Sequence, residues 1–260
     1  MALIKTKQEL ELLTVGGKLL GEVLAELARR CAPGVHTRDL NKEAERLIKQ
    51  MGGIPSFKGY APHGETPYPS AICASVNEAV VHTPALPGAE LHTGDILSID
   101  IGMIWKGLYT DTAITVPIGS VSSEAQALMK HTRASLFEGI KQCISGNSIA
   151  DIGKAIEEYI HPYGYGIVRG LVGHGVGHAV HEPPQIPNYF VRTNTKIILQ
   201  PGMVLALEPM ITMGGSETEV LEDEWTVVTK DRSLSAHFEH TVIVTNASPI
   251  IITARHGERV

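Results

Sequence analysis

Gly94 to Val116 has the sequence G-D-I-L-S-I-D-I-G-M-I-W-K-G-L-Y-T-D-T-A-I-T-V. Its two apolar runs, 96–103 and 108–116, are rich in β-branched residues and are bounded by glycine, which is typical of strands. We therefore expect a β-hairpin with a tight turn. The rest of the chain is organised around this hairpin, because each of its strands carries one aspartate.

The register of the hairpin decides how the two aspartates, Asp100 and Asp111, face each other. A turn at Trp105-Lys106 would place them directly opposite. A turn at Lys106-Gly107 would make them diagonal neighbours. Both registers put the two side chains on one face, because side chains alternate along a strand. Two buried like charges repel and are costly to desolvate, and a divalent metal would remove that cost. The alternative is one turn-capping aspartate beside an exposed one.

The composition is that of an ordinary globular protein. The chain has 260 residues, of which 43% are hydrophobic and 19% are charged, and its formal net charge is −6. This balance argues against a basic surface for nucleic acid. Three widely spaced cysteines, Cys31, Cys73 and Cys143, have no metal-binding pattern and predict reduced thiols. The sequence has no secretory pattern and no run of about 20 apolar residues, so we expect no membrane segment and a cytoplasmic location.

Capping motifs and helical spacing of apolar residues predict four helices. The expected helices run from Thr6 to about Pro33, from Thr37 to Met51, from Ser123 to about Cys143 and from Ser148 to about His161. Two helices thus precede the aspartate hairpin, and two more follow it.

The chain contains an internal repeat. Gly94–Asp100 matches Gly202–Glu208, with a carboxylate six residues after a glycine in both. V-H-T-P at 81–84 matches V-H-E-P at 180–183. A repeat on this scale must be recognised before a fold is assigned.

Two related halves would face each other across a pseudo-twofold axis. The stretch that begins at Asp111 resembles the stretch that begins at Glu239, which completes the match. We expect one domain, 1–260, with the halves at about 6–118 and 122–254. Its centre would gather four carboxylates and two histidines.

The repeat predicts a metal site. Its four carboxylates are Asp100, Asp111, Glu208 and Glu239. Two divalent metals balance four negative charges, and a pair of metals about 3.5–4 Å apart is a known hydrolytic device. Oxygen ligands with a single imidazole suit Mn, Fe(II) or Co. We interpret His174, which lies among glycines, as that imidazole.

Two other interpretations of residues 173–181 fit less well. A zincin helix needs Glu directly after the first histidine of the pair His174 and His178, but Gly175 stands there, and nearby glycines and prolines disfavour a helix. A dinucleotide loop needs G-x-G-x-x-G, which the glycine spacing of this stretch does not provide.

The chain resembles the bacterial-type, type I methionine aminopeptidases. The resemblance covers essentially the whole chain and rests on V-N-E-A-V-V-H, S-I-D-I-G, T-D-T-A, G-H-G-V-G-H-A-V-H-E-P-P, L-E-P-M and F-E-H-T, in this order. It implies the α+β pita-bread fold, with antiparallel sheets and outer helices, and two divalent metal ions (Co, Mn, Fe(II) or Zn). The metal ligands that it implies are Asp100, Asp111, His174, Glu208 and Glu239.

The activity that the resemblance implies is hydrolytic removal of the initiator methionine from nascent proteins, with a small second residue preferred. Asp111 and Glu239 would bridge both metals. Glu208 would also accept a proton, His181 would stabilise the tetrahedral oxyanion, and His82 would contact the scissile amide. Imidazoles titrate near neutrality, which suits proton exchange.

The resemblance also implies an apolar pocket for the methionine side chain. The residues that match the family's pocket are Tyr68, Cys73 and Trp225, for which core packing is the alternative. Two features depart from the family: the loop Ala61–Pro69 is longer, with His63 at an unusual offset, and Val180 stands where an aromatic residue is common. Six further histidines are interpreted as solvated or structural: His36, His92, His131, His161, His237 and His256.

The nearest alternative is a Xaa-Pro peptidase with the same fold and metals. Such enzymes usually carry a large N-terminal domain, whereas here the helical pattern begins at Thr6, and F-E-H-T favours the methionine branch. Type II methionine enzymes usually carry a helical insert, for which the 26 residues between His181 and Glu208 leave no room. A non-catalytic peptide-binding module is the alternative from another class, and such relatives lose metal ligands that this chain keeps.

The partners that we expect are the N-termini of nascent polypeptides and, transiently, the ribosome. We expect a monomer with no nucleic-acid binding of its own.

Overall fold

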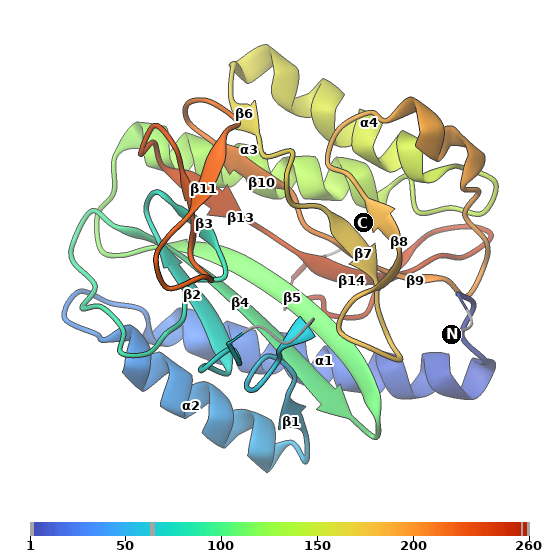
Figure 1. Ribbon diagram of the computed structural model, residues 1–260. Coiled ribbons are helices and arrows are strands. Elements are labelled where there is room, and N and C mark those ends of the chain that lie inside the picture. Colours follow the sequence, from blue (N-terminus) through green and yellow to red (C-terminus); the bar gives the residue numbers. More distant parts are fainter. Residues whose placement is uncertain (1–2, 63–65, 256, 259–260) are drawn as a thin grey trace.

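The computed structural model describes residues 3–62, 66–255 and 257–258. Figure 1 shows two helices along one side of the molecule and two along the opposite side, with most strands between them. The helices are α1 (Lys7–Arg30), α2 (Thr37–Gln50), α3 (Ser123–Ile140) and α4 (Ile149–Ile160), with the short 3-10 helices η2 (His161–Tyr163) and η3 (Arg192–Lys196). The four predicted helices are therefore present, in the predicted order.

Among the described residues, the strands form four sheets. The strands are β1 (Ile54–Pro55), β2 (Ile72–Val76), β3 (Ala79–Val81), β4 (Ile96–Trp105), β5 (Leu108–Pro117), β6 (Gly166–Ile167), β7 (Gly173–Gly175), β8 (Glu182–Ile186), β9 (Val204–Leu207), β10 (Met210–Thr212), β11 (Thr218–Val220), β12 (Val227–Thr229), β13 (Ser235–His237), β14 (His240–Ile243) and β15 (Ile250–Ile251). A four-stranded sheet has the order β1-β4-β2 with β5 paired to β4, and a five-stranded sheet has the order β15-β14-β9-β7-β8. Two three-stranded sheets, β13-β10-β6 and β11-β12-β3, complete the set.

The central hairpin folds with its turn at Lys106-Gly107. Strands β4 and β5 pair antiparallel along their whole lengths. Lys106 (φ 52°) and Gly107 (φ 82°) both have left-handed backbones, as a two-residue type I′ turn requires. This register pairs Gly102 with Asp111, so Asp100 and Asp111 are diagonal neighbours. The second of the two predicted registers is the observed one.

Local capping fixes where the helices begin. The capping boxes predicted at Thr6 and Ser148 are confirmed. At α3 the predicted cap was wrong by one residue: Ser122, not Ser123, accepts a hydrogen bond from the backbone N–H of Ala125. Both serines can cap a helix, and only the path of the backbone selects one of them.

The two halves of the chain meet where β5 passes the start of β14. The N–H of Glu239 donates to the carbonyl of Ala113 (3.0 Å), and the N–H of Ala113 donates to the carbonyl of Glu239 (3.4 Å). The hydroxyl of Thr241 donates to the carbonyl of Asp111 (2.7 Å) and accepts from its N–H (3.0 Å). Asp111 and Glu239, which come from different halves, therefore lie side by side at the seam.

The repeated glycines share one backbone role. Gly94 (φ 104°) and Gly202 (φ 87°) both have left-handed backbones directly ahead of β4 and β9, respectively. Glycine adopts this conformation without strain. The sequence predicts that Glu208 and Glu239 lie on strands, as Asp100 and Asp111 do. This prediction was wrong in detail, because β9 ends one residue before Glu208 and β14 begins one residue after Glu239. The single-domain division into halves at 6–118 and 122–254 stays a prediction.

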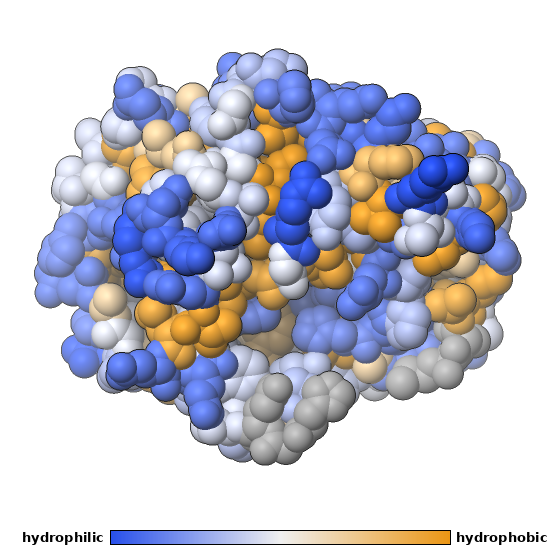
Figure 2. All heavy atoms as spheres, turned by 45° about the horizontal axis from the view of Figure 1, so that its top comes forward, coloured by the Kyte–Doolittle hydropathy of each residue, from blue (hydrophilic) through white to orange (hydrophobic). Residues whose placement is uncertain are grey.

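Two apolar clusters pack the helices onto the sheets. One joins Leu24 of α1 to Leu97 of β4, and the other joins Leu136 of α3 and Ile156 of α4 to Leu205 of β9. Figure 2 shows that hydrophilic side chains cover much of one face, with apolar ones gathered around a recess near its centre. In the described part of the chain, the helices are too short or too polar to cross a membrane.

Candidate active site

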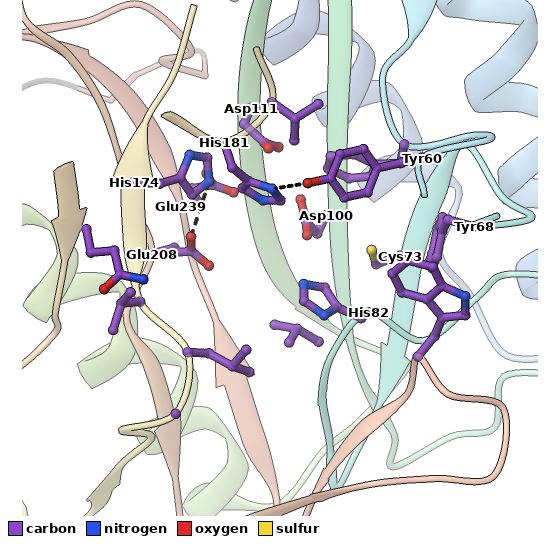
Figure 3. Close-up of a pocket in the computed structure, with 18 residues that line it drawn as sticks. Tyr60, Tyr68, Cys73, His82, Asp100, Asp111, His174, His181, Glu208 and Glu239 are labelled. Carbon is purple, nitrogen blue, oxygen red and sulfur yellow. Dashed lines mark hydrogen bonds and ion pairs between the residues drawn. The ribbon is translucent and has the colours of Figure 1, made fainter. Parts of the chain in front are cut away.

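A cavity of about 280 Å³ is lined by both halves of the chain (Figure 3). The histidines and carboxylates that line it are His82, Asp100, Asp111, His174, His181, Glu208 and Glu239. Tyr68 and Cys73 line it as well, together with Tyr60, which the sequence did not predict. Its largely apolar end adds Phe57, Val180 and Trp225. The structure therefore brings all ten of the predicted site residues to one cavity.

Five of these residues lie on, or directly next to, five different strands and converge at the polar end. Asp100 lies on β4, Asp111 on β5 and His174 on β7, while Glu208 follows β9 and Glu239 precedes β14. Asp111, His174 and Glu239 each offer one ligand atom, and these atoms lie within 4.8 Å of one another. His174 Nε2 lies 3.5 Å from Glu208 Oε1. These short distances mean that the side chains could bind the same metal ion.

The pKa values and the unpaired oxygens of the four carboxylates indicate a site for cations. Burial raises the pKa of Asp100 to about 7. Burial and neighbouring carboxylates raise the pKa of Asp111, Glu208 and Glu239 well above their usual range. Asp100 Oδ1 and Glu239 Oε1 are buried without a protein hydrogen-bond partner. Three buried carboxylates, the partly exposed Glu208 and one imidazole fit divalent cations, which supply the missing charge and also partners for the two unpaired oxygens.

The hydrogen bonds around these residues fix which atoms face the cavity. His174 Nδ1 donates to the carbonyl of Gly175 (2.9 Å), since a carbonyl can only accept. Burial lowers the pKa of His174 to about 3, so its ring is neutral and Nε2 keeps a free electron pair. One oxygen of Asp111 accepts from the N–H of Thr112 (2.9 Å). Such contacts orient metal ligands and set their tautomers.

The two histidines of the repeated V-H-x-P motif also line the cavity. His82 has a left-handed backbone (φ 59°) directly after β3. The ring of His181 meets that of His174 edge-on at 4.5 Å between centroids, and its Nδ1 lies 2.8 Å from the hydroxyl of Tyr60 (Figure 3). Burial lowers the pKa of His82 to about 4 and also lowers the pKa of His181. Both rings are therefore neutral at pH 7.

The apolar end of the cavity has a wall of aromatic rings. Phe57, Tyr68, Cys73 and Val180 form one buried cluster. The ring of Trp225 packs edge-on against Tyr68 at 5.1 Å between centroids. An apolar side chain fits such a pocket, since its walls are apolar and aromatic.

Comparison with known proteins places this geometry in a family. A model of metallopeptidase family M24 matches residues 11–246. The chain belongs to metallopeptidase family M24. A methionine aminopeptidase from Clostridium acetobutylicum is 44% identical over 253 residues, which cover 97% of this chain and 99% of that one. Methionine aminopeptidase 1 from Bacillus subtilis is 41% identical over 254 residues, with the same two coverages.

The solved structures agree with the sequence relatives. The crystal structure of a methionine aminopeptidase from Thermotoga maritima matches this M24 chain with a TM-score of 0.92 at 38% identity, over 97% of this chain and 99% of that one. The predicted α+β pita-bread fold is thereby confirmed, as is the prediction of a metal-dependent hydrolase. A divalent metal is the cofactor of this M24 peptidase.

Some residues of the M24 site were not predicted. Tyr60, which contacts His181, comes from a loop whose course the sequence pattern does not define. His237, interpreted as solvated or structural, is only 1% exposed, and its Nε2 lies 3.6 Å from Glu208 Oε2. It precedes Glu239 by two residues, so the alternation of a continuous strand, as the sequence predicts here, was a signal that both face the same side. In the structure, residues 238 and 239 interrupt that strand between β13 and β14.

Two of the histidines in the sequence predictions, His63 in the loop that is longer than in the family and His256, lie outside the described residues.

Proposed function

We propose that this M24 peptidase removes the N-terminal methionine from nascent polypeptides and prefers a small second residue. The observation that carries the proposal is the combination of the carboxylate cluster with a short apolar pocket beside it. Relatives named methionine aminopeptidase match almost the whole chain at 41–44% identity, which supports this substrate over others of the same fold.

We propose two divalent ions (Co, Mn, Fe(II) or Zn) as the cofactor. The residues proposed to hold them are Asp100, Asp111, His174, Glu208 and Glu239. Four carboxylates balance the charge of two such ions, and the orphaned oxygens of Asp100 and Glu239 support this number. When bound, the ions lower the pKa of water and polarise the scissile carbonyl.

The side chains around the ions have separate proposed roles. Glu208 accepts a proton from the attacking water, a role that a carboxylate next to the ions can fill; burial and the neighbouring carboxylates Asp100 and Asp111 raise its pKa. His181 is neutral, so it can donate a hydrogen bond to the oxyanion that develops on the scissile carbonyl. His82, which also lines the cavity, contacts the scissile amide and helps its nitrogen leave as the bond breaks.

The pocket is proposed to select methionine by shape and polarity. Tyr68, Cys73 and Trp225 would surround the side chain, with Phe57 and Val180 closing its end. A hydrophobic pocket separates side chains that differ by one methylene by only about 10–200-fold. Selectivity therefore depends on how closely these five residues pack.

The setting of the reaction follows from its substrate. We propose one catalytic unit, 1–260, that acts as a monomer in the cytoplasm, where nascent chains emerge. It would meet the ribosome transiently, without nucleic-acid binding of its own, which its net charge of −6 disfavours.

The test is turnover of Met-Ala-Ser beside Ala-Pro-Ala by purified enzyme supplied with Mn, Fe(II) or Co. Release of Met from the first peptide alone is the expected result. Cleavage of the proline peptide alone would move the chain to the Xaa-Pro branch with the same site. No cleavage of either peptide by metal-loaded protein would favour a peptide-binding module.

A further inference from the structure

A buried ion pair ties the N-terminal segment to the cavity loop, which we define as residues 176–182. Lys5 Nζ lies 2.6 Å from Glu182 Oε2, and the two side chains are only 1% and 3% exposed. The backbone N–H of Lys5 donates to the carbonyl of Gly202 (2.9 Å), which anchors the lysine beside β9. The ion pair therefore joins two segments that lie 177 residues apart in sequence.

The other oxygen of Glu182 holds the cavity loop in its turn. Glu182 Oε1 accepts hydrogen bonds from the backbone N–H groups of His178 and Ala179. The side chain of Lys5 passes directly over Gly177, where a Cβ atom would collide with it and where the backbone is left-handed (φ 135°). Glycine is required there because only it leaves room for the lysine and tolerates this backbone.

A second contact joins the same two segments. His178 Nε2 lies 2.8 Å from Glu9 Oε1, and the other oxygen of Glu9 accepts from the N–H of Thr6 (2.7 Å) in the capping box of α1. The cavity loop is thus held by two contacts: Glu9, in the first turn of α1, contacts His178, and Lys5 contacts the buried Glu182.

The cavity loop carries two residues that face the cavity. Val180 is part of the apolar wall, and His181 directly precedes Glu182 in the chain. Any shift of the Glu182 carboxylate would therefore move His181, whose ring must meet the scissile carbonyl at hydrogen-bond distance. We propose that Lys5 and Glu182 are positioning residues for His181, an inference that rests on the proposed aminopeptidase function.

Placement is a better explanation of this ion pair than stability alone. Taking two charges out of water offsets most of their attraction, so a buried pair is weak evidence for stability. Its fixed geometry, with all of its partners in one loop, defines where that loop lies. Misplacing a catalytic group by about 1 Å can lower a rate about 100-fold.

The test uses Lys5→Met and Glu182→Gln, with Lys5→Arg as the conservative variant and Lys7→Met as the matched control. Lys7 is exposed on the same segment. Glu182→Gln keeps the oxygen that the two loop amides need, so it serves if Lys5→Met fails to fold. Each variant is assayed for Met release from Met-Ala-Ser and for hydrogen exchange of residues 176–182 by mass spectrometry.

We expect Lys5→Met and Glu182→Gln to lower kcat about tenfold or more and to speed amide exchange in the cavity loop. KM should change less than threefold, Lys5→Arg should recover most of kcat, and Lys7→Met should match the wild type. In a His181→Ala background, Lys5→Met should lower kcat less than about twofold further, because the two changes act through one group.

Two results would overturn the inference. If the kcat losses of Lys5→Met and His181→Ala multiply in the double variant, Lys5 does not act through His181. Unchanged exchange of residues 176–182 in both charge variants would mean that the ion pair does not hold the loop. If the wild type releases no Met, the proposed function fails, and the exchange measurement still decides whether the ion pair places the loop.

Discussion

Replacing Asp100 by Asn should stabilise the metal-free protein and destabilise the metal-loaded one. Asp100 is 8% exposed, and its Oδ1 has no protein hydrogen-bond partner. Its ionised form is therefore costly without a cation. Asparagine has nearly the same shape and carries no charge, so it removes this cost while it also removes a proposed metal ligand.

The size of the effect follows from the pKa of this carboxyl. Burial raises the pKa of Asp100 from 3.8 to about 7, and each pKa unit corresponds to about 1.4 kcal/mol. Because the folded protein holds this proton more tightly than the unfolded chain, the cost is absent below about pH 4. It grows between about pH 4 and 7 and reaches about 4 kcal/mol above that range. The free energy of unfolding of metal-free Asp100→Asn should thus exceed that of the wild type by up to this amount at pH 8.5. The difference should shrink toward pH 4.

The assay is urea unfolding of both proteins at pH 8.5 and pH 5, with chelator or with Mn²⁺. With metal at about 1,000 times its dissociation constant, the free energy of unfolding of the wild type should rise by about 4 kcal/mol. The wild type should then be the more stable of the two proteins. Asp111→Asn serves as a second neutralising variant with the same expected inversion. If Asp100→Asn is less stable than the wild type in chelator at pH 8.5, the reasoning about uncompensated buried charge is refuted.

Three further substitutions test other parts of the site. Glu208→Gln should keep the folded structure, as judged by its circular dichroism spectrum, and lower kcat by about 10²–10⁴-fold; wild-type kcat would exclude Glu208 as the proton acceptor. His181→Ala should lower kcat far more than it raises KM, since a contact made mainly in the transition state acts on kcat, and a change in KM alone would contradict this role. Gly102→Ala would place a Cβ against the hydroxyl of Ser56 and 2.8 Å from the ring of Phe57, so it should cost about 1–3 kcal/mol of stability and raise KM for Met-Ala-Ser. An unchanged urea midpoint would mean that Ser56 and Phe57 can move aside freely.

The central hairpin could be predicted because its signals are local. Apolar runs rich in β-branched residues, together with bounding glycines, define both strands, and Lys106-Gly107 suits a type I′ turn. The sequence left two registers open, and the backbone φ angles of the turn select one. The repeat then extended the argument from Asp100 and Asp111 to Glu208 and Glu239, whose side chains meet those of the first half in one cavity.

The remaining parts depend on contacts between distant segments. The seam between Ala113 and Glu239 joins strands from different halves, and the spacing of residues along one strand does not encode it. Tyr60 reaches His181 across 121 residues of sequence. The ion pair of Lys5 with Glu182 was not predicted for the same reason, because an N-terminal lysine ordinarily stays in solvent.

The most direct test of the central claim is anomalous diffraction at the manganese edge from crystals of the Mn²⁺-loaded, active enzyme. We expect two peaks in the cavity, both next to Asp111 and Glu239, one also next to Asp100 and the other also next to His174 and Glu208. Peaks only outside this cavity, in crystals of enzyme that releases Met from Met-Ala-Ser, would contradict the assignment of these five residues as the metal ligands.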